Sequence, residues 1–266
     1  LSSTPKHILL YDFFEWEKPL FSHLPLLLNQ DRSKLSKRQG DVAVEDYRSK
    51  GYLKEALINF VALLGWTAGD DREFYYLNEL VENFTIERVN KSGAVFNIEK
   101  LNWLNAEHLR KKDNSEILHL LKEELSKSKF SNESYSDEYL LKVIDAMKER
   151  VSFIKEYIEK SPYFFDAPEE YEEAVVAKRW NDNSSELLIK LTDKFAKLEN
   201  PVKEDYENAL KETAEENETG NGALIHPLRL AVSGMGAGPG VFDIVEILGK
   251  DESIKRMKRA ADYIRK

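Results

Sequence analysis

Three cations and a hydroxyl lie close together in one short polar segment, Lys34-Leu35-Ser36-Lys37-Arg38, which leads to Gly40. Lysines act as point charges toward phosphate, while a hydroxyl and loop N–H groups donate hydrogen bonds to phosphate oxygens. A loop of this kind can close over a triphosphate and stabilise charge on a pyrophosphate leaving group. An ordinary solvated loop has the same composition, so the segment alone leaves both interpretations open.

Other patterns in the sequence give weaker chemical signals. The glycines from Gly234 to Gly240 lack the Lys-Ser/Thr that ends a phosphate-binding P-loop, so we expect a tight connection between helices there. The aromatic group at Tyr163, Phe164, Phe165 and Tyr171 suits either a packed hinge or a platform on which bases stack, and packing is the commoner use. No cysteine and no His-x3-His pair is present, so we expect no metal site.

The composition is typical of a globular protein and not of a disordered or membrane protein. The 266 residues are 42% hydrophobic, which is enough for real cores, and a chain without cysteines is typical of a reducing cytoplasm. No apolar run approaches the ~18 residues needed to span a bilayer, so we expect no membrane association. The chain begins at Leu1 without methionine and in the middle of a motif, which indicates a piece of a longer protein.

The net charge of -9 argues against nucleic-acid binding only if it is spread evenly. Residues 160–220 contain 8 Lys+Arg and 16 Asp+Glu, whereas residues 250–266 contain 7 and 3. The acidity is therefore local, and a basic face elsewhere remains compatible with the sequence.

Helical periodicity dominates the chain. Leu53, Ala56, Leu57, Phe60, Val61 and Leu64 form one apolar stripe that Gly65 ends. Ser3 and Pro5 predict the start of a helix that continues to about Trp16. Further helices are expected over 77–84, 98–112, 115–128, 137–160, 168–179, 184–198, 203–218, 224–232, 241–248 and 251–264.

We therefore predict a mainly α-helical fold with at most a short strand near 21–28. Trp16, Trp66 and Trp103 are expected to anchor hydrophobic cores. The expected divisions are 1–112, which carries the basic loop, then a helical subdomain over 113–165 and a second one over 166–266.

Several segments together resemble one enzyme family. Lys34 to Arg38 resembles the KMSKS signature of class I aminoacyl-tRNA synthetases, in the form KLSKR. The flanking segments look like those of bacterial-type glutamyl-tRNA synthetases: Ser3 to His7, His23 to Leu26, Val44 to Tyr47, Gly51 to Leu53, Ala62 to Trp66, Lys91 to Phe96, Lys100 to Asn105, Pro227 to Gly234 and Gly238 to Phe242. The resemblance is dense over 1–105 and 224–249 and thin between about 113 and 220.

The resemblance implies an activity for the longer protein. Enzymes of this family join glutamate to ATP with Mg²⁺ and transfer the acyl group to tRNA(Glu). In that scheme Lys34 and Lys37 contact the ATP phosphates as the catalytic cations, and Ser36 and Arg38 shape and charge the loop. The family pairs this loop with a His-x-Gly-His motif on an N-terminal Rossmann domain, and neither is present in this sequence. The chain is thus expected to be a catalytically inactive fragment that holds no cofactor alone.

What remains for the fragment is RNA binding, by a helical stem-contact region at 1–112 followed by a helical anticodon-binding region in the form of a cage or bundle. Arg150 lies in a segment that resembles a helix the family directs at the anticodon, where a guanidinium can read or stack on an unpaired base. The full set of expected RNA contacts is Arg110, Lys111, Lys112, Lys148, Arg150, Lys255, Arg256, Lys258 and Arg259.

A different function stays open at this point. The chain can instead be a helical protein-interaction scaffold derived from a synthetase, without RNA binding, and its net acidity suits that alternative. The retained KLSKR segment favours the synthetase interpretation, in which the partners are tRNA(Glu) and the N-terminal catalytic domain and the protein is a monomer.

Overall fold

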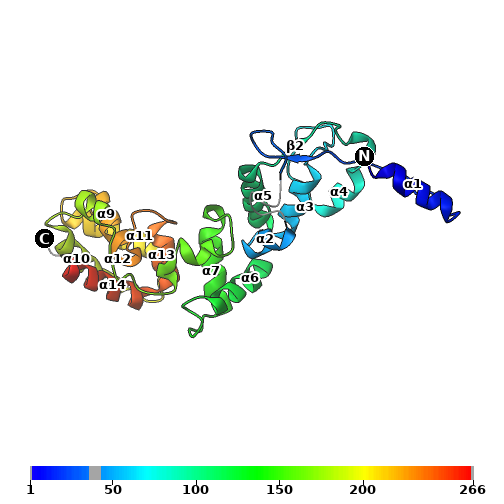
Figure 1. The fold of residues 1–266 in the computed structure, drawn as a ribbon. Coiled ribbons are helices and arrows are strands. Elements are labelled where there is room, and N and C mark those ends of the chain that lie inside the picture. Colours follow the sequence, from blue (N-terminus) through cyan, green and yellow to red (C-terminus); the bar gives the residue numbers. More distant parts are fainter. Residues whose placement is uncertain (1, 36–42, 265–266) are drawn as a thin grey trace. The chain divides into compact units, whose positions relative to one another are not determined.

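A computed structural model describes residues 2–35 and 43–264 of the chain (Figure 1). Its internal contacts divide it into two compact parts, Leu1–Asn105 and Ala106–Lys266, which we call unit 1 and unit 2. Helices dominate both units, which confirms the predicted fold class.

Unit 1 combines short helices with two very short strands (Figure 1). The strands pair in parallel, with Leu27 opposite Ala94 and Leu28 opposite Val95. The predicted strand near 21–28 is therefore present at the end of that range. The elements are α1 (Thr4–Phe13), β1 (Leu27–Leu28), α2 (Val44–Ser49), α3 (Lys54–Ala62), α4 (Leu77–Asn83), the 3-10 turn η1 (Ile86–Arg88), β2 (Ala94–Val95) and α5 (Ile98–Lys111), which continues into unit 2.

The predicted apolar stripe forms α3, and its buried side packs against α5. Phe60 contacts Tyr47, Leu101 and Leu104 in one buried cluster. A second cluster at the end of α3 gathers Trp66, Tyr75 and Leu80. Burial of such side chains stabilises each by about 1.5–3 kcal/mol relative to exposure, so these clusters hold α3 in place as the central helix of unit 1.

Two buried asparagines tie loops to the helices of unit 1. The amide of Asn59 accepts a hydrogen bond from Tyr75 N at 2.8 Å and donates one to Glu73 O at 3.0 Å. Asn105 accepts a bond from Leu53 N at 2.8 Å, which satisfies an N–H at the start of α3. Both side chains are fully buried, so both would cost stability if their partners were removed.

Two of the three tryptophans expected in cores are exposed. Trp66 is 3% exposed, as predicted, but Trp16 is 60% exposed and Trp103 is 43% exposed. Trp16 follows α1, a helix with no buried residue, and its indole stacks on neighbouring Phe14 instead. The prediction was wrong for Trp16 and Trp103 because unit 1 offers them no second layer to pack against.

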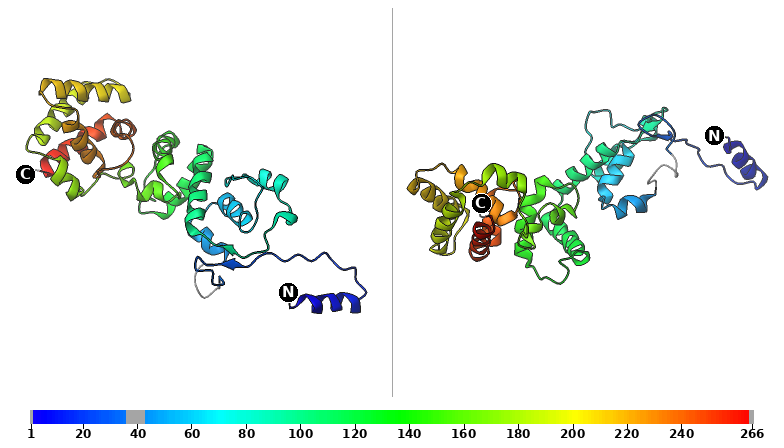
Figure 2. Two further views of the ribbon diagram at one scale, coloured as in Figure 1. Left: turned by 90° about the horizontal axis from the view of Figure 1, so that it is seen from above. Right: turned by 60° about the vertical axis from the view of Figure 1, so that its left-hand side comes forward.

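Unit 2 is a bundle of helices in which α12 occupies the centre (Figure 1, Figure 2). α12 packs on α14, α10, α13, α9 and α11, and α6 packs on α7. The elements after α5 are α6 (Asn114–Lys127), α7 (Asp137–Met147), η2 (Lys148–Arg150), α8 (Glu156–Glu159), η3 (Pro162–Phe164), α9 (Glu173–Arg179), α10 (Ser184–Ala196), α11 (Lys203–Glu216), α12 (Gly222–Ser233), α13 (Val241–Leu248) and α14 (Lys250–Tyr263).

The helix predicted over 137–160 is interrupted. α7 ends at Met147, η2 adds one tight turn, and Val151 adopts an extended conformation before α8. Ser152 N donates a hydrogen bond of 2.6 Å to the carboxylate of Glu156, the first residue of α8, which fixes the turn between η2 and α8. Val151 is buried, so its contribution to the core outweighs the local preference for a continuous helix.

The helix predicted over 168–179 begins only at Glu173. The preceding residues pack on the end of α12, where Glu172 N donates to Gly234 O at 2.9 Å and the Glu172 carboxylate accepts from Gly236 N at 2.9 Å. Gly234 has a φ of +74° and ends α12. The glycine-rich segment is thus a tight connection from α12 to α13, as predicted.

Candidate functional site

The base of the KLSKR segment is attached to the two-stranded sheet of unit 1. Lys34 forms an antiparallel bridge with Leu28, and Leu35 N donates to Leu27 O at 3.0 Å. A tight turn from Asn29 to Ser33 makes this return possible, with Ser33 N donating to Asp31 Oδ1 at 2.8 Å. The side-chain and backbone hydrogen bonds from Ser33 lower the pKa of Asp31. Ser36, Lys37 and Arg38 lie outside the described residues.

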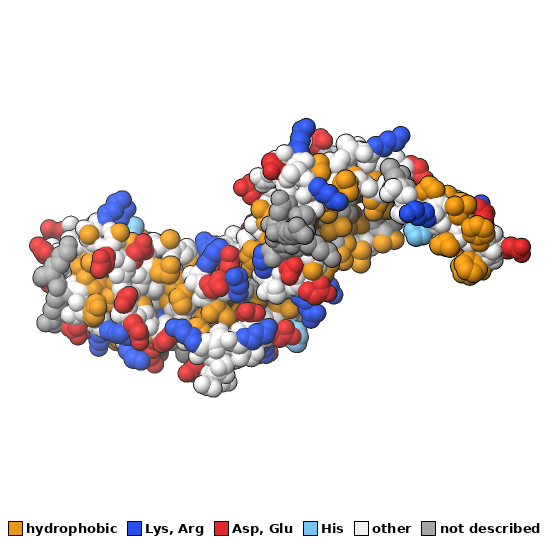
Figure 3. Space-filling view, viewed as in Figure 1, with side chains coloured by type: hydrophobic (Ala, Val, Ile, Leu, Met, Phe, Trp, Pro, Cys, Tyr) orange, Lys and Arg blue, Asp and Glu red, His pale blue; other side chains and the backbone are white. Residues whose placement is uncertain are grey.

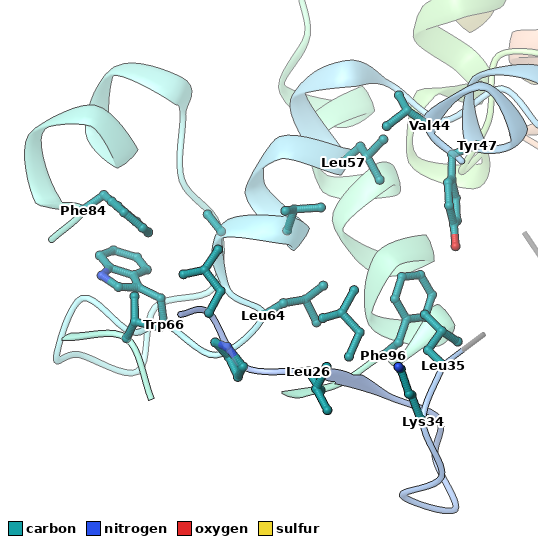
Figure 4. A pocket seen from close by; sticks show the side chains of 16 residues that line it. Leu26, Lys34, Leu35, Val44, Tyr47, Leu57, Leu64, Trp66, Phe84 and Phe96 are labelled. Carbon is teal, nitrogen blue, oxygen red and sulfur yellow. The ribbon is translucent and has the colours of Figure 1, made fainter. Parts of the chain in front are cut away.

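Lys34 is exposed and lies at the edge of an apolar groove of about 580 Å³ (Figure 4). Trp66 and Phe84 face each other at one end of the groove, with ring centroids 5.4 Å apart. At the other end Lys34 and Leu35 lie beside Phe96. Among the described residues that line the groove, Lys34 alone carries a charge, so a cation lies at the edge of an apolar space.

Arg150, the residue assigned to reading a base, is the last residue of η2 and is exposed. Its guanidinium donates to Ala146 O at 3.2 Å, which uses one of its five N–H groups. It lines a cleft of about 390 Å³ in unit 2, whose opposite wall includes Pro239 and Glu246. An exposed guanidinium in a cleft can stack on or hydrogen-bond an unpaired base.

Arg229 supports the wall of this cleft and was not among the residues predicted from the sequence. It donates to Pro239 O at 2.7 Å, and its partial burial lowers its pKa. A Cβ built at Gly238 would lie 3.0 Å from the Tyr163 hydroxyl and 3.6 Å from the Arg229 guanidinium. Burial raises the pKa of Tyr163 to about 12. The signal was present in the two motifs Pro227–Gly234 and Gly238–Phe242, whose contact only the fold reveals.

The cations near the start of unit 2 are engaged with neighbours. Arg110 pairs with Glu107, and Lys112 pairs with Glu116 at 2.7 Å. Lys148 Nζ donates to Lys112 O at 2.7 Å and to Asn114 Oδ1 at 2.6 Å, so it fastens η2 to the start of α6. These pairs are partly exposed, and water or RNA phosphate can compete with them at a cost of about 1 kcal/mol or less.

The basic cluster of α14 is divided by burial. Lys255, Lys258 and Arg259 lie on the exposed side of the helix. Arg256 is only 5% exposed, and its guanidinium donates to Tyr163 O at 2.7 Å and Val232 O at 2.9 Å. The aromatic group containing Tyr163 is buried as well, in agreement with the packing interpretation. Arg256 therefore has a structural role inside unit 2.

The described residues contain no group of three or more His, Cys, Asp or Glu that could hold a metal ion. No helix within residues 2–35 and 43–264 is long and apolar enough to cross a membrane.

Two family models match the chain, and together they cover most of it. Residues 116–261 match the anticodon binding domain, which corresponds closely to unit 2. Residues 1–103 match the catalytic domain of class I tRNA synthetases of the E and Q type, which corresponds to unit 1.

Individual relatives agree with the family models. The chain is 52% identical to a glutamate–tRNA ligase of Chloroherpeton thalassium, covering 99% of this chain and 54% of that protein. It is 46% identical to one of Prosthecochloris aestuarii with the same coverage. A crystal structure of the glutamate–tRNA ligase of Elizabethkingia meningosepticum, solved in complex with its amino acid, matches with a TM-score of 0.89 at 34% identity, over 99% of this chain and 55% of that one.

The chain spans about half the length of the curated relatives it matches. Within that half, the matched family models follow the same order as the two structural units. The chain therefore belongs to the glutamate–tRNA ligase family of class I tRNA synthetases, with an anticodon-binding domain at residues 116–261.

Proposed function

We propose that this chain is the tRNA-binding half of a glutamate–tRNA ligase and that it binds tRNA(Glu). The observation that carries the proposal is the helical unit 2, which matches the anticodon-binding domain and displays Arg150 in an open cleft. Sequence-specific RNA recognition uses unpaired bases that stack on planar side chains and bond to their edges. Arg150 has the chemistry and the exposure for that role.

The proposed division of work follows the chain. Residues 1–112 contact the inner corner of the tRNA, and the subdomains over 113–165 and 166–266 bind the anticodon arm. Arg110, Lys111, Lys112, Lys148, Lys255, Lys258 and Arg259 supply phosphate contacts, which position the RNA without reading its sequence. Arg256 is left out of this set because its guanidinium is bonded inside unit 2.

We further propose that the longer protein activates glutamate with ATP and Mg²⁺. ATP supplies the adenylate group and releases pyrophosphate, and the KLSKR segment of this chain contributes the phosphate contacts. Lys34 is exposed and therefore accessible to a phosphate, as this role requires. An N-terminal domain that holds adenosine is needed to complete the site, so both halves must be joined. We expect the whole protein to be a monomer in the cytoplasm.

Filter binding of tRNA(Glu) and an unrelated tRNA tests the proposal at one fixed salt concentration. Arg150→Ala is expected to weaken tRNA(Glu) binding about 5–150-fold, equivalent to about 1–3 kcal/mol for a lost base contact, and to reduce discrimination between the two RNAs. Arg179→Ala is the matched control, because Arg179 is also an exposed last residue of a short helix in unit 2.

The control variant should bind as the parent does. Equal affinity of the R150A variant and the parent chain for tRNA(Glu) would remove Arg150 from the RNA-reading role. Equal affinity of the parent chain for both RNAs would refute the proposed function itself.

A further inference from the structure

The segment from Gly234 to Gly240 joins α12 to α13 and contributes to one wall of the cleft beside Arg150. Pro239 in this segment lines the cleft. Residues 236–238 are Gly, Ala and Gly, and all three are exposed. They bury no side chain of their own, so the position of this wall depends on other parts of unit 2 that bind its backbone.

Hydrogen bonds from two directions hold the segment. On the side of the cleft, the Arg229 guanidinium donates to Pro239 O at 2.7 Å. On the other side, Glu172 N donates to Gly234 O at 2.9 Å, and the Glu172 carboxylate accepts from Gly236 N at 2.9 Å. Glu172 immediately precedes α9, which packs on α12 (Figure 1). The segment is therefore fastened to a helix of unit 2 through one acidic residue.

The glycines lie very close to the residues around the start of α9. A Cβ built at Gly234 would lie 2.8 Å from the Glu170 carbonyl oxygen, and a Cβ built at Gly236 would lie 2.6 Å from Val175 Cγ2. Both separations are too short for an ordinary van der Waals contact. Glycine at these two positions thus lets the backbone lie against residues 170–175, where the Glu172 carboxylate reaches the Gly236 N–H.

We propose that Glu172 is a positioning residue for the binding of tRNA(Glu). Its carboxylate holds the Gly236 end of the segment, so that Pro239 stays in place as a wall of the cleft that Arg150 lines. Glu172 acts through this backbone and does not itself touch the RNA. The inference rests on the proposed function, in which the cleft accepts an unpaired base. A wall that is already fixed loses less conformational entropy when the base binds than a loose one does.

The charge of Glu172 gives this role a distinctive signature. A carboxylate on unit 2 repels RNA phosphates, so removing its charge alone should leave RNA binding unchanged or slightly tighter. Acidic and basic side chains are interspersed over the face of unit 2 that Figure 3 shows, so the loss of one charge is expected to have a small effect. Loss of the hydrogen bond to Gly236 should instead weaken binding. The two effects differ in sign, and suitable substitutions separate them.

Filter binding at one fixed salt concentration compares the parent chain with Glu172→Ala, Glu172→Gln and Glu173→Ala. Glutamine keeps a side-chain oxygen that can accept from Gly236 N but carries no charge, whereas alanine has neither the oxygen nor the charge. Glu173 is an exposed acid at the first position of α9, so its replacement by alanine is the charge-matched control. Circular dichroism checks that every variant is folded at the assay temperature.

The E172A variant is expected to bind tRNA(Glu) about 3–10-fold more weakly than the parent, which is the effect of one lost hydrogen bond. Its affinity for an unrelated tRNA should stay within about twofold of the parent, because phosphate contacts do not depend on the cleft. The E172Q and E173A variants should bind both RNAs within about twofold of the parent. Recovery of tRNA(Glu) binding by glutamine would identify the hydrogen bond, and not the charge, as the cause.

Hydrogen exchange of the Gly236 amide, followed by NMR, measures the hold on the segment without RNA. Exchange should be at least about fivefold faster in the E172A variant, because the amide loses its acceptor and the segment opens more often. The E172Q and E173A variants should exchange at the rate of the parent.

Three results in the binding assay would overturn the proposal. They are parent-like tRNA(Glu) affinity of the E172A variant, equal weakening by E172A and E172Q, or tighter binding by all three variants, which would make Glu172 a repulsive charge only. Equal affinity of the parent chain for both RNAs would instead refute the proposed function. The exchange rate of Gly236 then decides separately whether Glu172 holds the segment: faster exchange in the E172A variant alone retains that role, and an unchanged rate refutes it.

Discussion

Neighbouring cations of α14 differ in whether they are buried or exposed. Arg256 donates to two backbone carbonyls and pairs with Glu252 at 2.8 Å, while Arg259 on the same helix is exposed. The sequence shows only that four cations lie within five positions, and helical periodicity does not say which of them faces the core. Which cation is buried depends on Val232 in α12 and Tyr163 in η3, which lie 24 and 93 residues before Arg256 and meet it only in the folded unit.

Arg256→Leu should destabilise unit 2 by about 2–4 kcal/mol, because two buried carbonyls lose their donor. Arg259→Leu changes an exposed position and should stay within about 0.5 kcal/mol of the parent. Urea unfolding followed by circular dichroism measures both. A loss of less than about 1 kcal/mol for the R256L variant would contradict the structural role given to Arg256.

Among the helices, long apolar stripes were predicted well and their interruptions were not. The stripe from Leu53 to Leu64 became α3, whereas the helix expected over 137–160 breaks after Met147. The first result follows from local periodicity alone. The second requires Val151 to enter a core, which depends on tertiary packing, while the hydrogen bond from Ser152 N to Glu156 is local. Arg150 lies at this break and lines a cleft together with Pro239 and residues of α13, which only the fold brings together, so the geometry of the cleft could not be predicted from the pattern.

Gly238→Ala tests the connection between α12 and α13. The φ of +149° at Gly238 suits glycine, and an added Cβ would press on the Tyr163 hydroxyl and approach Arg229. The expected loss of stability is about 1–3 kcal/mol. Gly220→Ala is the control, since no atom lies within 4 Å of the Cβ it would add. Thermal unfolding should show a lower Tm for the G238A variant only.

The start of α6 should make unit 2 sensitive to acid. The side-chain and backbone hydrogen bonds from Ser115 lower the pKa of Asp113, the N-cap of α6, below its ordinary value of 3.8. The stabilising contribution is therefore complete above about pH 3.8 and declines as the pH falls through the lower folded pKa. The Asp113→Asn substitution keeps a residue type that is a good N-cap and removes the carboxyl group that titrates.

Urea unfolding at a series of acidic pH values compares the D113N variant with the parent. The difference in stability between them should change as the pH falls below about 3.8. A constant difference over that range would show that Asp113 does not titrate differently in the folded unit.

For the whole molecule, the sequence motifs correctly indicated the enzyme family and the half of the enzyme involved. They did not indicate that unit 1 exposes most of the apolar surface, because an incomplete core has the same composition as a complete one. Trp16 illustrates this difference: its type predicts burial, but the residues that would cover it are absent from unit 1 as described.

The isolated chain is expected to lack glutamate-dependent exchange of pyrophosphate into ATP, because the sequence contains no His-x-Gly-His motif to complete the phosphate site. The exchange assay should give a rate equal to the blank, while the full-length ligase gives a clear signal. Exchange by the 266-residue chain alone would show that its own residues suffice for adenylate formation.

Filter binding of tRNA(Glu) and an unrelated tRNA to the parent chain, measured from 50 to 200 mM salt, tests the central claim most directly. With the seven proposed phosphate contacts, affinity should fall about 10³- to 10⁴-fold over this range as counterions are released, while tRNA(Glu) stays the tighter ligand at every salt concentration. Affinity that does not change with salt and is the same for both RNAs would contradict the account and favour a helical scaffold without RNA binding.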